Sequence, residues 1–261
     1  MRRLSFPHAF YLLLAMVLVS VTACDNDDDA PACDLSATAT AEAFEINVAA
    51  TGGTAPYRYS IDGENFDSNT RIEVDEATNY TVTVRDASDC EVTVAVTGTS
   101  LEQFTDTRDD AVYRVVKIGD QIWLGENLNY ITNDDSFCYD DEAANCAEDG
   151  RLYTWDAANT AVPAGWKLPA RSDINDLIEA LGGDDQDAAV AMRMGGSSGW
   201  DEQLAGRYGT FYVDKDDEGT YWLSNEVNET EAESVDVDDD IVDLDEADDK
   251  TSRHSVRLLK D

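Results

Sequence analysis

Residues 112–130 read VYRVVKIGDQIWLGENLNY, and the fold prediction for the second half of the chain starts from this stretch. Val, Ile, Tyr and Trp, the residues most enriched in β-strands, dominate both Val112–Ile118 and Gln121–Leu124. Gly119 and Asp120 between the two runs supply the chemistry of a tight turn. The stretch therefore predicts a β-hairpin that opens a domain.

The residues after this hairpin predict helices first and strands later. A helix is expected from Ser172, because Ile174, Leu177, Ile178 and Leu181 share one face and Gly182 and Gly183 end the pattern. A second helix is expected over 152–159. Short strands are expected over 207–213, 220–224, 234–237, 241–244 and 255–259. This order indicates an α+β domain.

Five further motifs follow the hairpin. They are CYDDEAANC (138–146), GRLYTWDAA (150–158), PAGWKLP (163–169), YWLSNE (221–226) and SVRLLKD (255–261). Their order and spacing resemble the Fibrobacter succinogenes major paralogous domain over residues 108–261. The resemblance implies a C-type-lectin-like α+β fold in a secreted or surface protein.

Residues 33–98 predict a separate all-β module. Strand patterns occur at 45–49, 80–85 and 91–96, with turn residues at 51–56 and 61–63. The length suits a small sandwich. Residues 52–60 and 80–90 resemble the repeat of the gliding adhesin SprB, which implies an immunoglobulin-like spacer; a binding role is the alternative. A polar linker over 99–107 is expected to follow.

The N-terminus predicts export and a lipid anchor. Arg2 and Arg3 precede a nearly unbroken apolar stretch of 13 residues at 9–21, a length typical of a signal peptide and short of the about 20 residues that span a membrane. Residues 21–24, VTAC, resemble a lipobox, which implies a signal peptide over 1–23 and acylation of Cys24; an incidental cysteine is the alternative. The acidic tether at 24–32 resembles an export signal of Bacteroidota lipoproteins. These features imply the outer membrane, facing the exterior.

The remaining four cysteines predict two disulfides, because a secreted context permits them. They fall as one pair in each half, Cys33 with Cys90 and Cys138 with Cys146. Free thiols or a metal site are the alternatives. The sequence has no CxxC motif, and His254 is the only histidine beyond the signal peptide, which argues against zinc.

The charge of the chain is strongly negative, with 18 basic and 56 acidic residues and a net charge of −38. Loss of Arg2 and Arg3 leaves 16 against 56, or −40. Nucleic acid is excluded as a partner, because phosphate binding needs a basic face. The spread of the acids favours adaptation to salt, and calcium is the alternative cofactor, with Asp236, Asp238 and Asp240 as candidate ligands. No cluster matches an EF-hand loop.

Five tryptophans bear on function. Trp123, Trp155, Trp166 and Trp222 lie among apolar neighbours and are expected in the core. Trp200 follows a Gly-rich stretch, so its ring is the candidate for an exposed ligand-binding platform. The sequence lacks Glu-Pro-Asn and Gln-Pro-Asp, the usual motifs of a calcium-dependent lectin site.

Two function classes follow from these features. The first is a non-catalytic surface lipoprotein whose terminal domain binds glycan, matrix or another envelope protein. The alternative is a secreted glycan hydrolase that uses two carboxylates. The absence of a GxSxG motif and of a cofactor-binding loop argues against an enzyme.

The melting temperature of the protein is expected to rise with NaCl up to molar concentration. Like charges repel over a Debye length of about 30 Å at 0.01 M salt and about 3 Å at 1 M, so screening relieves the repulsion. Thermal unfolding in a NaCl series, with and without millimolar Ca²⁺, checks this. A gain that comes entirely from Ca²⁺ would contradict salt adaptation and point to Asp236, Asp238 and Asp240.

Overall fold

The computed structural model describes residues 33–132 and 135–261. The predicted signal peptide, Cys24 and the acidic tether lie outside the described residues. The chain divides into two compact units. The first contains the residues up to Ala41, Glu45–Val74 and Thr78–Gly98, and the second contains Glu42–Phe44, Asp75–Ala77 and Thr99–Asp261.

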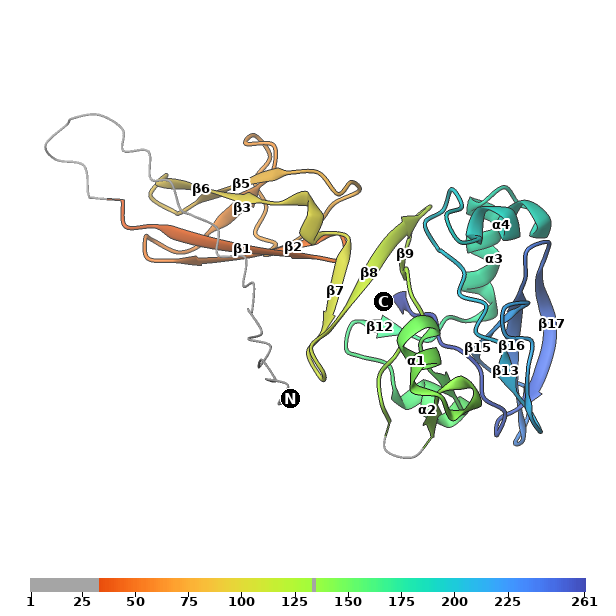
Figure 1. Ribbon diagram of the computed structural model, residues 1–261. Coiled ribbons are helices and arrows are strands. Elements are labelled where there is room, and N and C mark those ends of the chain that lie inside the picture. The colour runs from red at the N-terminus through yellow and green to blue at the C-terminus, as the bar shows by residue number, and fades with distance from the viewer. Residues whose placement is uncertain (1–32, 133–134) are drawn as a thin grey trace, which may run out of the picture. The chain divides into compact units, whose positions relative to one another are not determined.

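The first unit is built from β-strands in two three-stranded sheets that face each other (Figure 1). The sheet orders are β1-β2-β4 and β3-β5-β6. Alternate residues of β5 and β6 are buried between the sheets, as the two-residue period of a strand requires. The strands predicted at 45–49, 80–85 and 91–96 are confirmed. The elements are β1 (Ser36–Glu42), β2 (Glu45–Thr51), β3 (Arg58–Ser60), β4 (Arg71–Glu73), β5 (Tyr80–Arg85) and β6 (Glu91–Val96).

The second unit is mixed α+β, as predicted. A five-stranded sheet has the order β12-β18-β9-β8-β7, and a three-stranded sheet has the order β15-β16-β17. The helices α3 and α4 pack against β15 and β17. The helices are α1 (Ala143–Asp149), α2 (Trp155–Thr160), α3 (Arg171–Ala180) and α4 (Asp185–Met192). The strands are β7 (Gln103–Asp106), β8 (Ala111–Ile118), β9 (Gln121–Leu124), β10 (Ser136–Phe137), β11 (Leu152–Tyr153), β12 (Trp166–Lys167), β13 (Arg207–Tyr208), β14 (Tyr212–Val213), β15 (Gly219–Glu226), β16 (Glu231–Val237), β17 (Val242–Asp249) and β18 (Leu259–Lys260).

Both predicted disulfides are present, one in each unit. Cys33 and Cys90 have Cα atoms 5.8 Å apart and connect the start of β1 to the start of β6, so this bond links the two sheets of the first unit. Cys138 and Cys146 have Cα atoms 4.9 Å apart. They close a short loop between β10 and the middle of α1.

The local predictions hold best where the sequence pattern is periodic. The hairpin of β8 and β9 pairs Val116 with Trp123, and α3 buries Ile174, Leu177 and Ile178. The start of α3 differs from the prediction: the Asp173 carboxylate accepts a hydrogen bond from the Ala170 backbone N–H at 2.7 Å, whereas Ser172 was expected as the cap.

Four elements depart from the predictions. The strand expected at 255–259 is reduced to β18 at Leu259–Lys260, because residues 256–258 lie outside any strand. The expected linker at 99–107 contains β7, because Phe104 is buried in the core and Asp106 pairs with Arg108. The expected helix at 152–159 is a short strand followed by α2, which Thr154 caps. The expected strand at 207–213 is two short strands joined by a turn. Among the described residues, no helix has the length and apolar character to cross a membrane.

Candidate functional site

The tryptophans predicted to lie in the core are inside the second unit. Trp123, Trp166 and Trp222 are buried, and Trp155 is partly buried with its indole N–H donating to the Leu223 carbonyl at 2.8 Å. The expectation of an exposed ring at Trp200 is wrong, because this side chain is only 2% exposed. Its indole N–H donates to the Glu202 carboxylate at 2.9 Å, and its ring packs against Trp123. Trp200 is therefore a core residue that cannot present its face to a ligand.

A buried polar network surrounds Trp200. The Arg257 side chain is 1% exposed; it donates to the Trp200 carbonyl at 2.6 Å and to Asn127 Oδ1 at 2.8 Å. Glu202 also accepts from the Tyr221 hydroxyl at 2.5 Å. Burial raises the pKa of Glu202 to about 7, although the positive charge of Arg257 and the two hydrogen bonds lower it. The network is closed to solvent, so its role is to hold the core together.

A second cluster gathers carboxylates around Arg207 on β13. Its guanidinium lies 3.1 Å from Asp214, 3.7 Å from Asp236 and 4.0 Å from Glu218. The Asp236 side chain is 13% exposed, and burial followed by the charge of Glu218 raises its pKa to about 7. One of its carboxylate oxygens, Oδ1, is buried without a hydrogen-bond partner.

His254 borders this acidic cluster. Its Nε2 lies 3.5 Å from Asp248, and its ring packs edge-on against Trp222 with centroids 4.1 Å apart. Burial first and then the charge of Arg207 lower the pKa of His254 to about 4, while Asp248 opposes the change. The imidazole is therefore neutral at physiological pH.

The three predicted calcium ligands have separate partners. Asp236 faces Arg207, Asp238 accepts from the backbone N–H groups of Asp240 and Ile241, and Asp240 lies 3.6 Å from Arg193. Across the described part of the chain, no three His, Cys, Asp or Glu side chains form a group that could hold a metal ion. In the described residues, Asp236, Asp238 and Asp240 therefore do not form a common ligand set for calcium.

An aromatic surface is the best candidate for ligand binding. We define the hairpin patch by Phe137, Tyr139, Tyr208, Phe211, Tyr212 and Arg253. The turn between β13 and β14 places Phe211 outward, where 68% of its surface is exposed. Tyr212 packs against Tyr139 and Tyr208, with ring centroids 4.9 and 4.8 Å apart. These three tyrosines are half-buried, so each has a packed and an open side.

The disulfide loop and the C-terminal segment position the hairpin patch. Tyr139 directly follows Cys138, and a side chain at Gly206 would place its Cβ 2.9 Å from the Tyr139 ring. Gly206 has φ +64°, so glycine suits both the backbone and the close approach. Backbone hydrogen bonds of 3.0 and 2.7 Å join Tyr208 to Arg253. Three segments far apart in the sequence thus build one surface.

Polar groups border the rings of the hairpin patch. Arg253 donates to the Tyr212 hydroxyl at 3.0 Å, and that hydroxyl donates to the Asp141 carboxylate at 3.1 Å. Burial and the bond to Asp141 raise the pKa of Tyr212. Burial and the charge of Asp140 raise the pKa of Tyr139. The phenols therefore stay protonated at neutral pH and can donate and accept hydrogen bonds.

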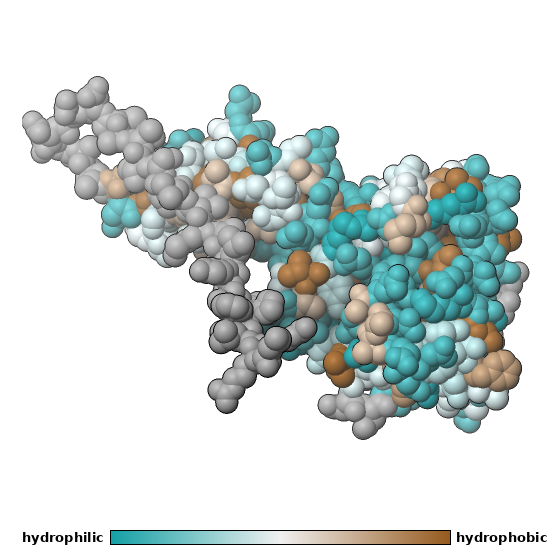
Figure 2. Space-filling view, viewed as in Figure 1, coloured by the Kyte–Doolittle hydropathy of each residue, from teal (hydrophilic) through white to brown (hydrophobic). Residues whose placement is uncertain are grey.

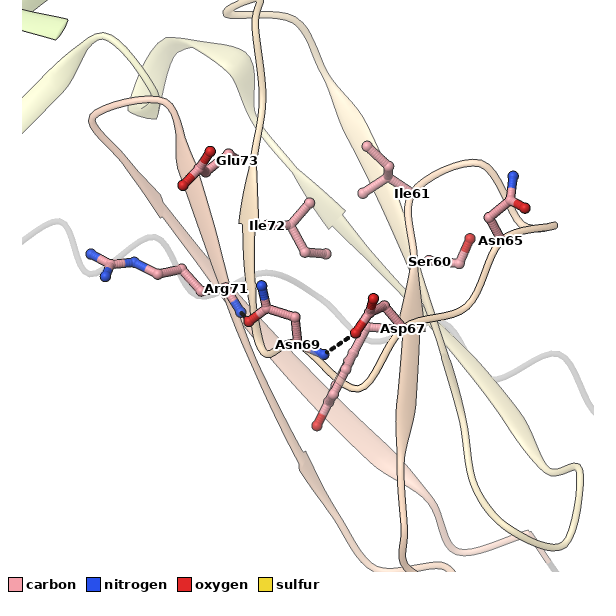
Figure 3. Close-up of a pocket in the computed structure, with 9 residues that line it drawn as sticks. Ser60, Ile61, Asn65, Asp67, Asn69, Arg71, Ile72 and Glu73 are labelled. Atoms are coloured by element: carbon pink, nitrogen blue, oxygen red, sulfur yellow. Dashed lines mark hydrogen bonds between the residues drawn. The ribbon is translucent and has the colours of Figure 1, made fainter. Parts of the chain in front are cut away.

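The first unit has a groove of about 360 Å³ between the end of β3 and β4. Figure 3 shows Ile61 and Ile72 on opposite sides of it, with polar side chains at the rim. Asn69 N–H donates to Asp67 at 2.9 Å, and Arg71 N–H donates to Asn69 at 3.1 Å. These side chains at the rim accept hydrogen bonds from backbone N–H groups of their own loop, so we assign the groove no ligand.

The remaining visible surface is largely polar. Figure 2 shows hydrophilic residues over most of this face, with hydrophobic residues in small separate groups. The second unit is therefore a mixed α+β domain. Hydrogen-bonded polar networks are buried in its core, and the hairpin patch is exposed at its surface.

Comparison with known proteins places this domain in a family. Residues 116–260, more than half of the chain, match the Fibrobacter succinogenes major domain, and the chain belongs to that family. No curated protein and no solved structure matches the chain. The match begins within β8 and ends in β18, so it includes every residue of the hairpin patch.

Proposed function

We propose that this chain is a non-catalytic cell-surface lipoprotein whose second unit binds glycan through the hairpin patch, for adhesion. The exposed Phe211 ring carries the proposal, because an exposed aromatic face suits the apolar face of a sugar. The polar groups around the adjacent Tyr212, from Arg253 and Asp141, are of the kind that bonds to sugar hydroxyls. In this proposal the second unit has a C-type-lectin-like fold. The first unit is an immunoglobulin-like spacer similar to the SprB repeat. Matrix or another envelope protein is the other partner class.

Anchoring at Cys24 is the second part of the proposal. The 21–24 stretch VTAC after an apolar run supports it. We expect mass analysis of the mature N-terminus to show a lipid-modified cysteine at position 24, and Cys24→Ser to release the protein from the outer-membrane fraction. A mature N-terminus at another position would contradict the anchor and leave glycan binding untouched.

Glycan binding is expected to depend on Phe211. On a glycan array, Phe211→Ala should weaken binding about tenfold, because it removes the stacking surface and leaves the fold intact. Met194→Ala is the matched control, since Met194 is equally exposed in the same unit at 69%. Equal loss in both variants, or binding unaffected by Phe211→Ala, would place the ligand site elsewhere.

The alternative function is a carboxylate-dependent glycan hydrolase. The raised pKa values of Asp236 and Glu218 favour it, because a general acid must hold its proton near neutral pH. Release of reducing ends from a polysaccharide panel would support this alternative only if Asp236→Asn abolished it. We favour binding, since Asp236 is mostly buried and faces Arg207.

A further inference from the structure

The disulfide of the second unit joins a turn to a short helix. Cys138 directly precedes the 3-10 turn Tyr139–Asp141, and Cys146 lies in the middle of α1. Cys146 is only 5% exposed, whereas Cys138 is partly exposed. Thiol–disulfide exchange requires access to the bond. A thiol in solution can therefore approach this disulfide from the side of Cys138.

The helix α1 is held in place by contacts other than the disulfide. The Asn129 side-chain amide donates to the Cys146 carbonyl at 2.8 Å. The Asn127 side-chain amide donates to the Asp149 carbonyl at 2.9 Å, and Lys215 forms an ion pair with the Asp149 carboxylate. These contacts do not depend on the sulfur atoms, so α1 keeps its anchors when the disulfide is cleaved.

The turn at Tyr139–Asp141 needs an external constraint. Asp140 and Asp141 have φ values of 53° and 56°, in the left-handed region that costs free energy for residues other than glycine. Asn145 of α1 donates to the Tyr139 carbonyl at 2.8 Å, and the disulfide is the covalent link between the same two segments. In this position the Tyr139 ring packs on Tyr212, and Asp141 accepts a hydrogen bond from the Tyr212 hydroxyl.

The hairpin of β13 and β14 depends on such neighbours. Each of its strands has only two residues, and a two-stranded hairpin is at best marginally stable alone. On one side Tyr212 contacts Tyr139 and Asp141, and on the other Tyr208 bonds to the backbone of Arg253. Release of the turn removes the first set of contacts and leaves the second.

We propose that the Cys138–Cys146 disulfide is a redox-sensitive constraint that keeps the hairpin patch assembled. Reduction by a dithiol releases the turn and loosens the β13–β14 hairpin, while the core of the second unit stays folded. In that step the dithiol is oxidised to its own disulfide, and the two cysteines take up two electrons and two protons to become thiols. The consequence for ligand binding rests on the proposed function: reduction weakens glycan binding by loosening the patch.

Hydrogen exchange of the whole protein, read by mass spectrometry, tests the constraint. Backbone amides at 207–213 should exchange about tenfold faster in the Cys138→Ser, Cys146→Ser double variant than in wild type, because local opening becomes easier. Dithiothreitol added to the folded wild-type protein should give the same local change, which separates the effect from any failure of the double variant to fold. Unchanged exchange at 207–213 after reduction would overturn the inference.

Three controls locate the effect. Exchange in α3, which is packed in the core, reports global unfolding and should stay unchanged. Cys33→Ser with Cys90→Ser removes the disulfide of the first unit and should leave 207–213 unchanged. Tyr139→Ala, with the disulfide intact, should reproduce most of the acceleration, because it removes the ring contact with Tyr212. Equal acceleration in α3, or no effect of Tyr139→Ala, would contradict a local constraint that acts through the turn.

The glycan array separates the failure of this inference from that of the proposed function. If wild type binds glycan and reduction accelerates local exchange without weakening that binding, the disulfide does not govern the site and the inference is overturned, while glycan binding stands. If wild type binds no glycan, the proposed function fails, and the exchange result alone decides whether the disulfide constrains the patch.

Discussion

Arg257→Met lowers the free energy of unfolding of the second unit by about 3–5 kcal/mol, because it removes one partner from a buried charged network. The methionine fills most of the space, but the Trp200 carbonyl and Asn127 Oδ1 lose their donor. Each unsatisfied buried acceptor costs about 1–3 kcal/mol. Glu202 also loses the positive charge that offsets its burial, so its pKa rises further.

Tryptophan fluorescence during urea unfolding measures this change. All five tryptophans lie between Trp123 and Trp222, so the signal reports on the second unit alone. Arg193→Met is the control, since Arg193 is a surface residue that bonds to the Asp239 carbonyl, and it should cost less than about 1 kcal/mol. Similar losses in the two variants would mean that the network does not stabilise the core as described.

Asp236→Asn is expected to stabilise the second unit by roughly 1–3 kcal/mol more at pH 8 than at pH 5. The folded-state pKa of Asp236 is raised from 3.8 to about 7. The stability contributed by the protonated Asp236 carboxyl is therefore complete below pH 3.8 and is lost as the pH rises through 7. Asparagine stays neutral in the same position and avoids that loss.

His254 also makes the stability of the second unit depend on pH, but in the direction opposite to Asp236. The effect of Asp236 must therefore be measured as the difference between wild type and Asp236→Asn. Its pKa is lowered from 6.5 to about 4, so its contribution is present above pH 6.5 and is lost as the pH falls through 4. The difference between wild type and Asp236→Asn removes this background. Urea unfolding at pH 5 and pH 8 checks the result, with Asp239→Asn as the surface control. Equal destabilisation by Asp236→Asn at both pH values would contradict the raised pKa.

Local periodicity made part of the fold predictable. The β8–β9 hairpin and α3 follow from residues within a few positions of one another, and these elements match the predictions. β7 was missed because its four residues carry only one buried apolar side chain, Phe104, and the partner of that side chain is supplied by tertiary packing.

The site was harder to predict because its residues meet only in the folded chain. Trp200 follows the Gly-rich stretch 195–199, which suggested an exposed ring. The ring is buried because Glu202, Tyr221 and Arg257, which the local sequence pattern does not bring together, surround it in the folded chain. The hairpin patch left a signal that could have been used: residues 207–213, RYGTFYV, place Gly209 and Thr210 in the middle of an apparent strand. Three aromatic residues around such a turn indicate an exposed aromatic tip.

The bond between Cys33 and Cys90 also determines how the first unit bears mechanical load. A pulling force applied through the chain before Cys33 passes along the covalent bond to Cys90, because the 57-residue separation between them is bypassed. Strands β1 to β5 all lie inside that closed loop, so tension cannot extend them. Only β6 and the residues up to Gly98 remain in the load path. Under tension the unit therefore behaves as a short, stiff link that lengthens by a few residues rather than by its full contour.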